Sequence, residues 1–307
     1  MSVKTVHVDS HAIELSHPDK VLFPGDGITK GELIDYYQRV AATMLPHVRQ
    51  RAISMQRFPN GIAESGFYQK EAPDYFPDWI DRVMVPVEEK GKAQPQVVCN
   101  NAATLVYLAN LDCITPHIWL SRTDSLHNPD RLIFDFDPAS DDFAPIRKAA
   151  QSMRQLLADL GLTSFVMTTG SRGLHVVVPL DRSAAFDVVR AFAKDVADVL
   201  VSRNPTALTI EVRKVARQGR LFVDYLRNSF AQTSVAPYSV RPKPGAPVAT
   251  PLDWDELAAP ELSSQRYTLT NIFHRLAQRE DPWSGIMQRG YAIGEARRLL
   301  DDLRSGA

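Results

Sequence analysis

Arg131-Leu-Ile-Phe-Asp-Phe-Asp-Pro138 opens the part of the chain in which strand and helix patterns alternate most closely. Its apolar and aromatic residues predict a strand at 131–136. The spacing of apolar residues further on predicts a helix at about 144–160, which Gly161 ends. A second apolar run predicts a strand at 164–169. The stretch therefore begins with the order strand, helix, strand.

A third strand, Leu174-His-Val-Val-Val-Pro-Leu180, follows almost at once. Only residues 170–173 separate it from the second strand, which is the spacing of a hairpin. A helix at 185–203 and strands near 208–214 and 221–225 complete the pattern. The order strand, helix, strand, strand, helix, strand is typical of the split βαβ unit of ferredoxin-like and RNA-recognition-like folds. We therefore expect an α+β fold.

The residues before this region carry a different mixture of patterns. Thr29-Lys-Gly-Glu32 has the form of a capping box and precedes an amphipathic run at 33–44, so we expect a helix there. Residues 52–58 resemble a strand that the turn Pro59-Asn-Gly61 closes, and 102–111 resemble a helix. Proline-rich connections are expected between these two elements, through Pro73, Pro77, Pro86 and Pro95.

Composition narrows the class of protein. A chain of 307 residues with 44% hydrophobic content can bury a sizeable core. The apolar runs are too short for a membrane span and the first residues lack a secretory signal, so we expect a soluble cytoplasmic protein. Two cysteines, Cys99 and Cys113, fit a reducing compartment better than a secreted one.

Charge is separated along the chain. The net charge of −1 is not typical of a dedicated nucleic-acid binder. Residues 213–220, however, hold four cations and no acid, whereas residues 130–142 are strongly acidic. Such separation suits a metal site beside a track for phosphates. The alternative is a solvated loop and a solvated turn.

Asp135 and Asp137 are the first candidates for chemistry. Side chains alternate along a strand, so the two carboxylates point the same way, roughly 6.6 Å apart at Cα, while Phe136 points into the opposite layer. Two carboxylates on one face repel each other unless a cation lies between them, and oxygen ligands suit Mg²⁺ or Mn²⁺. The structural alternative is a strand end that begins a turn at Pro138.

A second candidate is the turn Thr168-Thr-Gly-Ser-Arg-Gly-Leu-His175. Glycines flanking a turn expose backbone N–H groups, and here a hydroxyl, a guanidinium and an imidazole accompany them. These groups complement phosphate oxygens. An ordinary hairpin turn with glycine at left-handed positions is the alternative.

The third candidate is Asp224 in the apolar run Leu221-Phe-Val-Asp-Tyr225. A buried carboxylate needs a partner, which is either a shared metal ion or a neighbouring arginine such as Arg220 or Arg227. Three acids on two strands beside a phosphate-type turn are the parts that two-metal phosphoryl transfer requires.

Taken in order, these residues resemble a known family. The chain is similar to the polymerase domain of bacterial ligase D, which belongs to the archaeo-eukaryotic primase superfamily and is used in non-homologous end joining. The resemblance begins at Leu15-Ser-His-Pro-Asp-Lys-Val-Leu-Phe-Pro24, passes through Asp135-Phe-Asp-Pro138, Gly170-Ser-Arg-Gly-Leu-His175 and Phe222-Val-Asp-Tyr225, and ends near Trp283. It implies template-directed addition of nucleotides, preferably ribonucleotides, to 3′-hydroxyl ends at gaps and double-strand breaks.

The resemblance also implies roles for individual residues. The catalytic acids that hold two Mn²⁺ or Mg²⁺ ions would be Asp135, Asp137 and Asp224. The NTP or dNTP substrate would be bound by His117, Ser171, Arg172, His175, Arg227 and Arg241. On the residues alone, His117 also fits a buried core histidine, and Arg227 and Arg241 also fit surface ion pairs.

DNA contacts are implied in the same way. Lys20 and Lys30 match lysines that recognise a 5′-phosphate across a gap, a role that ammonium groups can serve. Lys30 in the first turn of a helix opposes the macrodipole, which favours a bound anion over the alternative of a solvated lysine. Phe67-Tyr68 matches a Phe-Phe pair that stacks on the template, with tyrosine as a departure. A loop that aligns DNA ends would supply Arg213, Lys214, Arg217 and Arg220.

The implied organisation is an archaeo-eukaryotic primase-like core with three parts. These are an N-terminal α/β lobe at 1–125 for DNA contacts, a catalytic lobe with the split βαβ unit at 126–285, and a tail helix at 286–307 that either docks elsewhere or packs on its own core. The implied partners are nucleoid DNA with gaps or 3′ overhangs and a 5′-phosphate, and the Ku end-binding protein. Ligase and nuclease modules of the same parent chain are implied if this is an excised domain, and the alternative is a standalone polymerase.

Two rival functions remain open. A phosphohydrolase of the haloacid dehalogenase type also has a strand that ends in Asp-x-Asp, but its next positions usually offer Thr or Val, whereas Pro138-Ala139 follow here. A non-catalytic module that bridges DNA ends is the second rival, and the three acids argue against it. The sequence contains no nucleotidyl-lysine ligase motif, so we expect no sealing activity.

Overall fold

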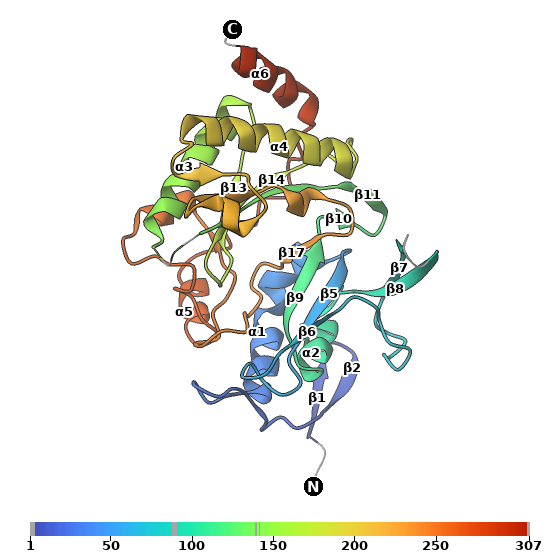
Figure 1. Ribbon diagram of the computed structural model, residues 1–307. Helices are drawn as coiled ribbons and strands as arrows, with labels where there is room; N and C mark the ends of the chain where they lie inside the picture. The colour runs from blue at the N-terminus through green and yellow to red at the C-terminus, as the bar shows by residue number, and fades with distance from the viewer. Residues whose placement is uncertain (1–3, 88–90, 139, 141, 306–307) are drawn as a thin grey trace. The chain divides into compact units, whose positions relative to one another are not determined.

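The computed structural model describes residues 4–87, 91–138, 140 and 142–305 (Figure 1). Two compact units divide the chain: unit 1 comprises residues 1–119, 233–249 and 267–275, and unit 2 comprises residues 120–232, 250–266 and 276–307. These limits differ from the predicted lobes, because 120–125 fall in unit 2 and two later segments return to unit 1. The functional roles given to the lobes stay a prediction.

Unit 2 is built on a six-stranded sheet. Its strands, in spatial order, are β15 (Leu208–Thr209), β16 (Leu221–Asp224), β12 (Arg131–Asp137), β14 (Leu174–Pro179), β13 (Phe165–Thr168) and β18 (Pro251–Leu252). The helices α3 (Ala144–Asp159) and α4 (Phe186–Arg203) pack on one face of this sheet (Figure 1). The predicted split βαβ order is confirmed.

Alternation along β12 explains this layer arrangement. Leu132, Phe134 and Phe136 are fully buried, whereas Asp135 and Asp137 on the opposite face are half-buried. Burying the three apolar side chains against helices stabilises the sheet by roughly 2 kcal/mol for each residue. The acids consequently lie on the face that the helices leave open.

One predicted strand is much too long. Residues 208–214 form a strand only at Leu208–Thr209, and Lys214–Arg217 form a 3₁₀ helix. The hydroxyl of Thr209 accepts the N–H of Glu211, and the carboxylate of Glu211 accepts the N–H of Arg213. These side chains take the place of a ladder partner, so the chain leaves the sheet after two residues.

The tail forms the helix α6 (Ile293–Ser305), which packs on α4 within unit 2 (Figure 1). Ile293, Ala296 and Leu300 are its buried residues. Both Arg297 and Arg304 form ion pairs with Asp195 of α4. Of the two alternatives for the tail, the structure therefore favours packing on its own core.

Unit 1 contains a second sheet. Its strands, in spatial order, are β17 (Thr233–Val235), β9 (Cys113–Trp119), β5 (Ala52–Arg57), β8 (Lys92–Val98) and β7 (Arg82–Val87), and β6 (Phe67–Gln69) also pairs with β5. Two helices, α1 (Lys30–Val48) and α2 (Ala102–Asn110), pack against each other. The predicted capping box is confirmed, because Thr29 and Glu32 satisfy each other's backbone N–H groups.

The expected proline-rich connections are partly wrong, because Pro86 lies in β7 and Pro95 lies in β8. Proline is tolerated in a strand where its nitrogen needs no partner. β7 is the edge of its sheet, and β5 pairs with β8 only at Val97 and Val98, beyond Pro95.

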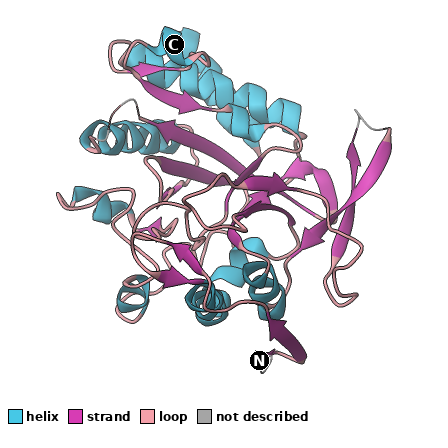
Figure 2. Cartoon of the chain, turned by 60° about the horizontal axis from the view of Figure 1, so that its bottom comes forward, coloured by secondary structure: helices cyan, strands magenta, loops and turns pink. Residues whose placement is uncertain are grey.

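Short elements complete the chain. These are the ladders β1 (Lys4–Val8) with β2 (His11–Leu15), β3 (Val21–Phe23) with β4 (Ile28–Thr29), and β10 (Ser121–Arg122) with β11 (Ser125–Pro129), together with α5 (Ile272–Leu276), η3 (Leu226–Asn228) and η4 (Trp254–Ala258). The mixture of strands, helices and long irregular segments (Figure 2) is that of the expected α+β class. Cys99 and Cys113 are buried free thiols. Among the described residues, no helix has the length and hydropathy to cross a membrane.

Candidate active site

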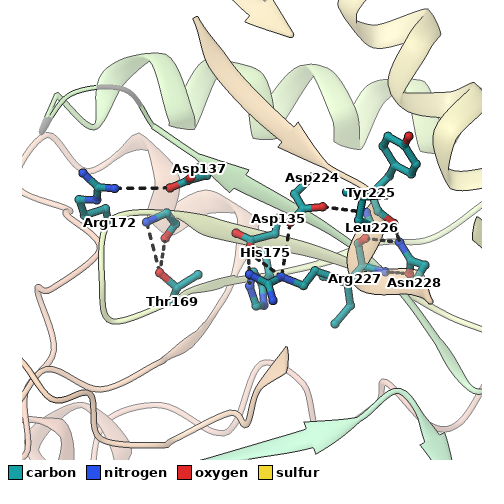
Figure 3. Close-up of polar contacts among 12 residues, drawn as sticks. Asp135, Asp137, Thr169, Arg172, His175, Asp224, Tyr225, Leu226, Arg227 and Asn228 are labelled. Carbon is teal, nitrogen blue, oxygen red and sulfur yellow. Dashed lines mark hydrogen bonds and ion pairs between the residues drawn. The ribbon is translucent and has the colours of Figure 1, made fainter. Parts of the chain in front are cut away.

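A row of polar side chains crosses three neighbouring strands of unit 2 (Figure 3). Asp135 of β12 lies directly opposite Asp224 of β16 and directly opposite His175 of β14. Residues opposite each other in antiparallel strands share a face, so the two carboxylates and the imidazole meet. The sheet register therefore places the first and third predicted acids side by side.

Arg227 neutralises part of this charge. Its Nε lies 3.6 Å from Oδ2 of Asp135 and 3.5 Å from Oδ2 of Asp224. Nε2 of His175 lies 3.5 Å from Oδ2 of Asp135. Burial, and then the negative charge of Asp135, raise the pKa of Asp224 above its usual value, and Arg227 opposes this effect. Two adjacent carboxylates therefore share the guanidinium of Arg227, and the pKa of Asp224 is still raised.

Asp137 faces different partners. Its Oδ2 lies 3.2 Å from Nη1 of Arg217, and its Oδ1 lies 3.8 Å from Nη2 of Arg172. Within the described part of the chain, no three His, Cys, Asp or Glu side chains meet as a metal-binding group. The three predicted acids lie on adjacent strands, but arginines engage each of them.

Asn228 fixes the element that carries Arg227. Its Nδ2 donates to the carbonyl of Ile133 at 2.7 Å, and its Oδ1 accepts the N–H of Ile133 at 2.8 Å. The amide thus imitates a neighbouring strand and attaches η3 to β12. Asn228 is fully buried. The site therefore depends on a residue outside the predicted set.

Replacing Asn228 by Ala is expected to lower the free energy of unfolding by roughly 2–4 kcal/mol, because two buried groups of Ile133 lose their partner. Chemical denaturation followed by tryptophan fluorescence measures this change. Asn60→Ala, at an exposed turn position, is the matched control and should change little. A loss at Asn228 no larger than the control's would contradict the attachment.

The turn between β13 and β14 is internally braced. The hydroxyl of Thr169 accepts the N–H groups of Ser171 and Gly173, and the carbonyl of Ser171 accepts Nε2 of Gln265 at 2.6 Å. A Cβ on Gly173 would collide with the carbonyl oxygen of Phe136, so only glycine fits there. The turn therefore presents Ser171 and the exposed Arg172 beside Asp137.

The basic loop 213–220 is folded partly onto itself. Arg217 stacks on the ring of Phe222 at 3.8 Å and also bonds the carbonyls of Glu211 and Val212. Arg220 bonds backbone carbonyls at residues 205, 216 and 217. Arg213 and Lys214 are exposed. Of the four DNA contacts predicted in this loop, Arg213 and Lys214 are thus exposed to solvent, and Arg217 faces the candidate catalytic acid Asp137.

Two predicted nucleotide contacts belong to unit 1. His117 lies in β9, is 9% exposed and meets the ring of Tyr68 edge-on. Arg241 lies in the segment after β17 and is half-buried. Their role in nucleotide binding stays a prediction.

The two predicted phosphate lysines share an acid. Nζ of Lys20 lies 2.7 Å from Oδ1 of Asp112, and Nζ of Lys30 lies 3.5 Å from the same atom. Lys30 also donates to the hydroxyl of Ser16 at 2.7 Å. Lys30 is 1% exposed, so the alternative of a solvated lysine is wrong, and burial lowers its pKa. Two cations against one acid leave an excess positive charge.

The predicted stacking pair is available on the surface of unit 1. Phe67 is 45% exposed and Tyr68 is 56% exposed, both in β6. The guanidinium of Arg57 lies over the ring of Phe67 at 5.6 Å. Exposed aromatic faces beside a cation suit stacking on bases.

Three further residues organise these sites. Asn228 and Asp112 lie outside the predicted motifs, and Thr169 lies inside the predicted turn but had no predicted role. Each is a short polar residue at a sharp change of chain direction, and Asp112 has a positive φ of 60°. Such residues commonly bond nearby backbone, which is a signal that could have marked them.

The chain is similar to known proteins in both sequence and structure. The profile of the family described as LigD, primase-polymerase domain, matches residues 29–283. A multifunctional non-homologous end joining protein LigD from Mycolicibacterium smegmatis is 33% identical over 83% of this chain and 34% of its own length. A protein of the same description from Pseudomonas aeruginosa is 32% identical over 93% of this chain and 34% of its own length.

A solved structure is also similar. It is described as the polymerase domain from Mycobacterium tuberculosis ligase D in complex with DNA, and it aligns with a TM-score of 0.84 and 31% identity over 91% of this chain and 99% of that chain. The present chain spans about a third of the length of the curated relatives. The chain belongs to the family of LigD primase-polymerase domains.

Proposed function

We propose that this protein is a template-directed nucleotidyltransferase that adds nucleotides to 3′-hydroxyl ends at gaps and double-strand breaks during non-homologous end joining. The observation that carries the proposal is the pairing of Asp135 with Asp224 on the open face of the sheet, beside the β13–β14 turn. Membership of the LigD family and the similarity to a polymerase domain in complex with DNA support it.

Asp135, Asp137 and Asp224 are proposed to hold two divalent ions, Mn²⁺ or Mg²⁺. The donors fit such ions, because they are carboxylate oxygens from adjacent strands. Burial, and then the neighbouring acid Asp135, raise the pKa of Asp224, and a bound cation would oppose both effects. When bound, the ions would activate the attacking 3′-hydroxyl and neutralise charge on the departing pyrophosphate. The chain's own residues would position the two reactants.

The nucleotide triphosphate is assigned to the turn and its neighbours. Ser171, Arg172 and His175 of unit 2 offer a hydroxyl, a guanidinium and an imidazole, and Arg227 adds a second guanidinium. For His117 and Arg241, which belong to unit 1, nucleotide binding is proposed from the family resemblance alone. A preference for ribonucleotides is part of the proposal, and incorporation of the two sugars at matched concentration tests it, since equal efficiency would refute the preference.

DNA is the proposed macromolecular substrate. Phe67 and Tyr68 would stack on the template, Lys20 and Lys30 would attract a 5′-phosphate, and the loop with Arg213, Lys214, Arg217 and Arg220 would meet the backbone. The Ku protein, and ligase and nuclease modules in a longer parent chain at the nucleoid, remain proposed partners.

Primer extension on gapped DNA tests the proposal. Wild-type protein with Mn²⁺ and nucleotides should lengthen the primer opposite the template, and Asp135→Ala should not. Absence of extension, or extension that Asp135→Ala leaves unchanged, would rule out the polymerase function. Binding of gapped DNA without extension would favour the rival end-bridging module.

Arg217 would compete with a bound ion for Asp137, because its Nη1 lies 3.2 Å from Oδ2 of that acid. Arg217→Ala is therefore expected to lower the half-saturating Mn²⁺ concentration by about fivefold, because an ion then displaces no ion pair. Titration of Mn²⁺ against the melting temperature measures this without catalysis. Arg213→Ala, an exposed cation of the same loop, is the control. An unchanged metal requirement in Arg217→Ala would argue against the competition.

A further inference from the structure

A polar recess lies next to the candidate active site in unit 2. Its volume is about 390 Å³, and its lining residues are Arg190, Asp224, Leu226, Arg227, Ser229 and Gln232. Asp224 is therefore shared between the row of acids and this recess. The lining carries two guanidinium groups and one carboxylate, so the part of the recess away from Asp224 is positively charged.

Arg190 is the unusual member of this lining. It lies in the second turn of α4 and is exposed. Among the described residues, no hydrogen bond or ion pair engages its guanidinium, whereas Arg227 contacts Asp135 and Asp224. A free guanidinium bordering a recess that ends at a catalytic acid is suited to an anion from outside the chain.

The order of strands in the sheet places the recess and the β13–β14 turn on opposite sides of β12. The β13–β14 turn, to which the triphosphate is assigned, lies on the β14 side of β12. The recess lies on the β16 side, where Asp224 begins the segment that carries Arg227, Ser229 and Gln232. In an in-line displacement the attacking 3′-oxygen and the departing pyrophosphate lie on opposite sides of the α-phosphorus, so a triphosphate on the β14 side would leave the β16 side for the 3′ end.

We propose that Arg190, with Ser229 and Gln232, forms a clamp for a phosphodiester near the 3′ end of the strand being extended. The clamp holds that strand so that its terminal hydroxyl lies beside Asp224. Ser229 and Gln232 offer further polar groups to the same backbone. The assignment rests on the proposed function, because it names the strand that the polymerase site would receive.

Binding of a primer–template with single uncharged linkages tests the clamp. A methylphosphonate replaces, one at a time, each of the last three phosphodiesters of the primer, and fluorescence anisotropy with Mg²⁺ but no nucleotide reports affinity. At one linkage the wild-type protein should lose about fivefold to tenfold in affinity. Arg190→Gln should bind unmodified DNA more weakly by a similar factor and show no further loss at that linkage.

The controls separate the clamp from general electrostatics. Arg203→Gln removes an exposed arginine from the end of the same helix and should retain the wild-type response. Methylphosphonates in the template strand should weaken both proteins equally. Arg190→Gln should also lower the slope of log affinity against log salt by about one phosphate contact.

Specific outcomes would overturn the clamp. They are wild-type affinity in Arg190→Gln, an unchanged methylphosphonate response in that variant, or a raised KM for the nucleotide with unchanged primer affinity, which would place the triphosphate in the recess instead. Failure of the proposed function would look different. Wild-type protein would then bind primer–template without extending it, and the affinities of wild type and Arg190→Gln for modified DNA would still test the clamp.

Discussion

Asp224→Asn is expected to reduce nucleotide addition by on the order of a thousandfold, because a neutral amide replaces one of the carboxylates that would stabilise the transition state through bound ions. The substitution is nearly isosteric. Asn keeps an oxygen that can accept the N–H of Leu226, which Asp224 now accepts at 2.7 Å. Single-turnover extension of a gapped primer measures the loss directly.

The same variant should not be less stable than the wild type without metal. Burial and Asp135 raise the pKa of Asp224, so the folded state binds more protons than the unfolded state between the two pKa values. Stability from this group is present below the unfolded pKa and is lost as pH rises through the raised folded pKa. At neutral pH the ionised Asp224 therefore destabilises the fold, and Asn removes that cost.

Thermal unfolding in EDTA and in Mn²⁺ distinguishes the two effects. In EDTA at neutral pH, Asp224→Asn should melt at or above the wild-type temperature, and Mn²⁺ should stabilise only the wild type. Asp159→Asn, an exposed acid of α3, is the control that should follow the wild type in both media. An Asp224→Asn protein that melts several degrees lower in EDTA would mean that lost activity reflects damage to the fold.

Lys20→Ala is expected to lower the preference for 5′-phosphorylated over 5′-hydroxyl gapped DNA by about tenfold, since one charge-assisted contact to the phosphate is lost. Lys20 is the more accessible of the two lysines, with 30% of its side chain exposed against 2% for Lys30. Removing both lysines should abolish the preference. Anisotropy titrations with the two DNA forms measure the ratio.

Asp112→Asn provides the reciprocal test of this site. The acid now pairs with Lys20 and lies near Lys30, so its neutralisation should free positive charge and increase the preference for the phosphate. Asn also tolerates the left-handed backbone at this position, where φ is 60°. A preference that persists in the double lysine variant, or that falls in Asp112→Asn, would contradict the assignment.

The central order of elements could be predicted because it depends on local patterns. Long periodic helices such as 144–159 and 186–203, and the apolar run of β14, leave little choice of state. The closeness of Asp135 and Asp224 could also be predicted, because both motifs lie on strands of one split βαβ unit. Burial of Phe134 and Phe136 then decides which way the acids face.

What could not be predicted depends on contacts between distant residues. The pairing of Asp137 with Arg217 requires the loop after β15 to fold back, and no spacing in the sequence specifies that. Lys30 is buried because Asp112, from the end of another helix, neutralises it. The strands that contain Pro86 and Pro95 depend on which partner lies on each side. These features are set by tertiary structure and not by propensity.

The return of the chain to unit 1 has a consequence for synthesis on the ribosome. β9 is emerging long before β17, its outer neighbour, because all of residues 120–232 are translated between them. Until then the free N–H and C=O groups of β9 are open to pairing with another nascent chain, a hazard of any unprotected edge. A polypeptide truncated before Val235, which lies opposite His117, would keep that edge of β9 exposed until the fragment was degraded.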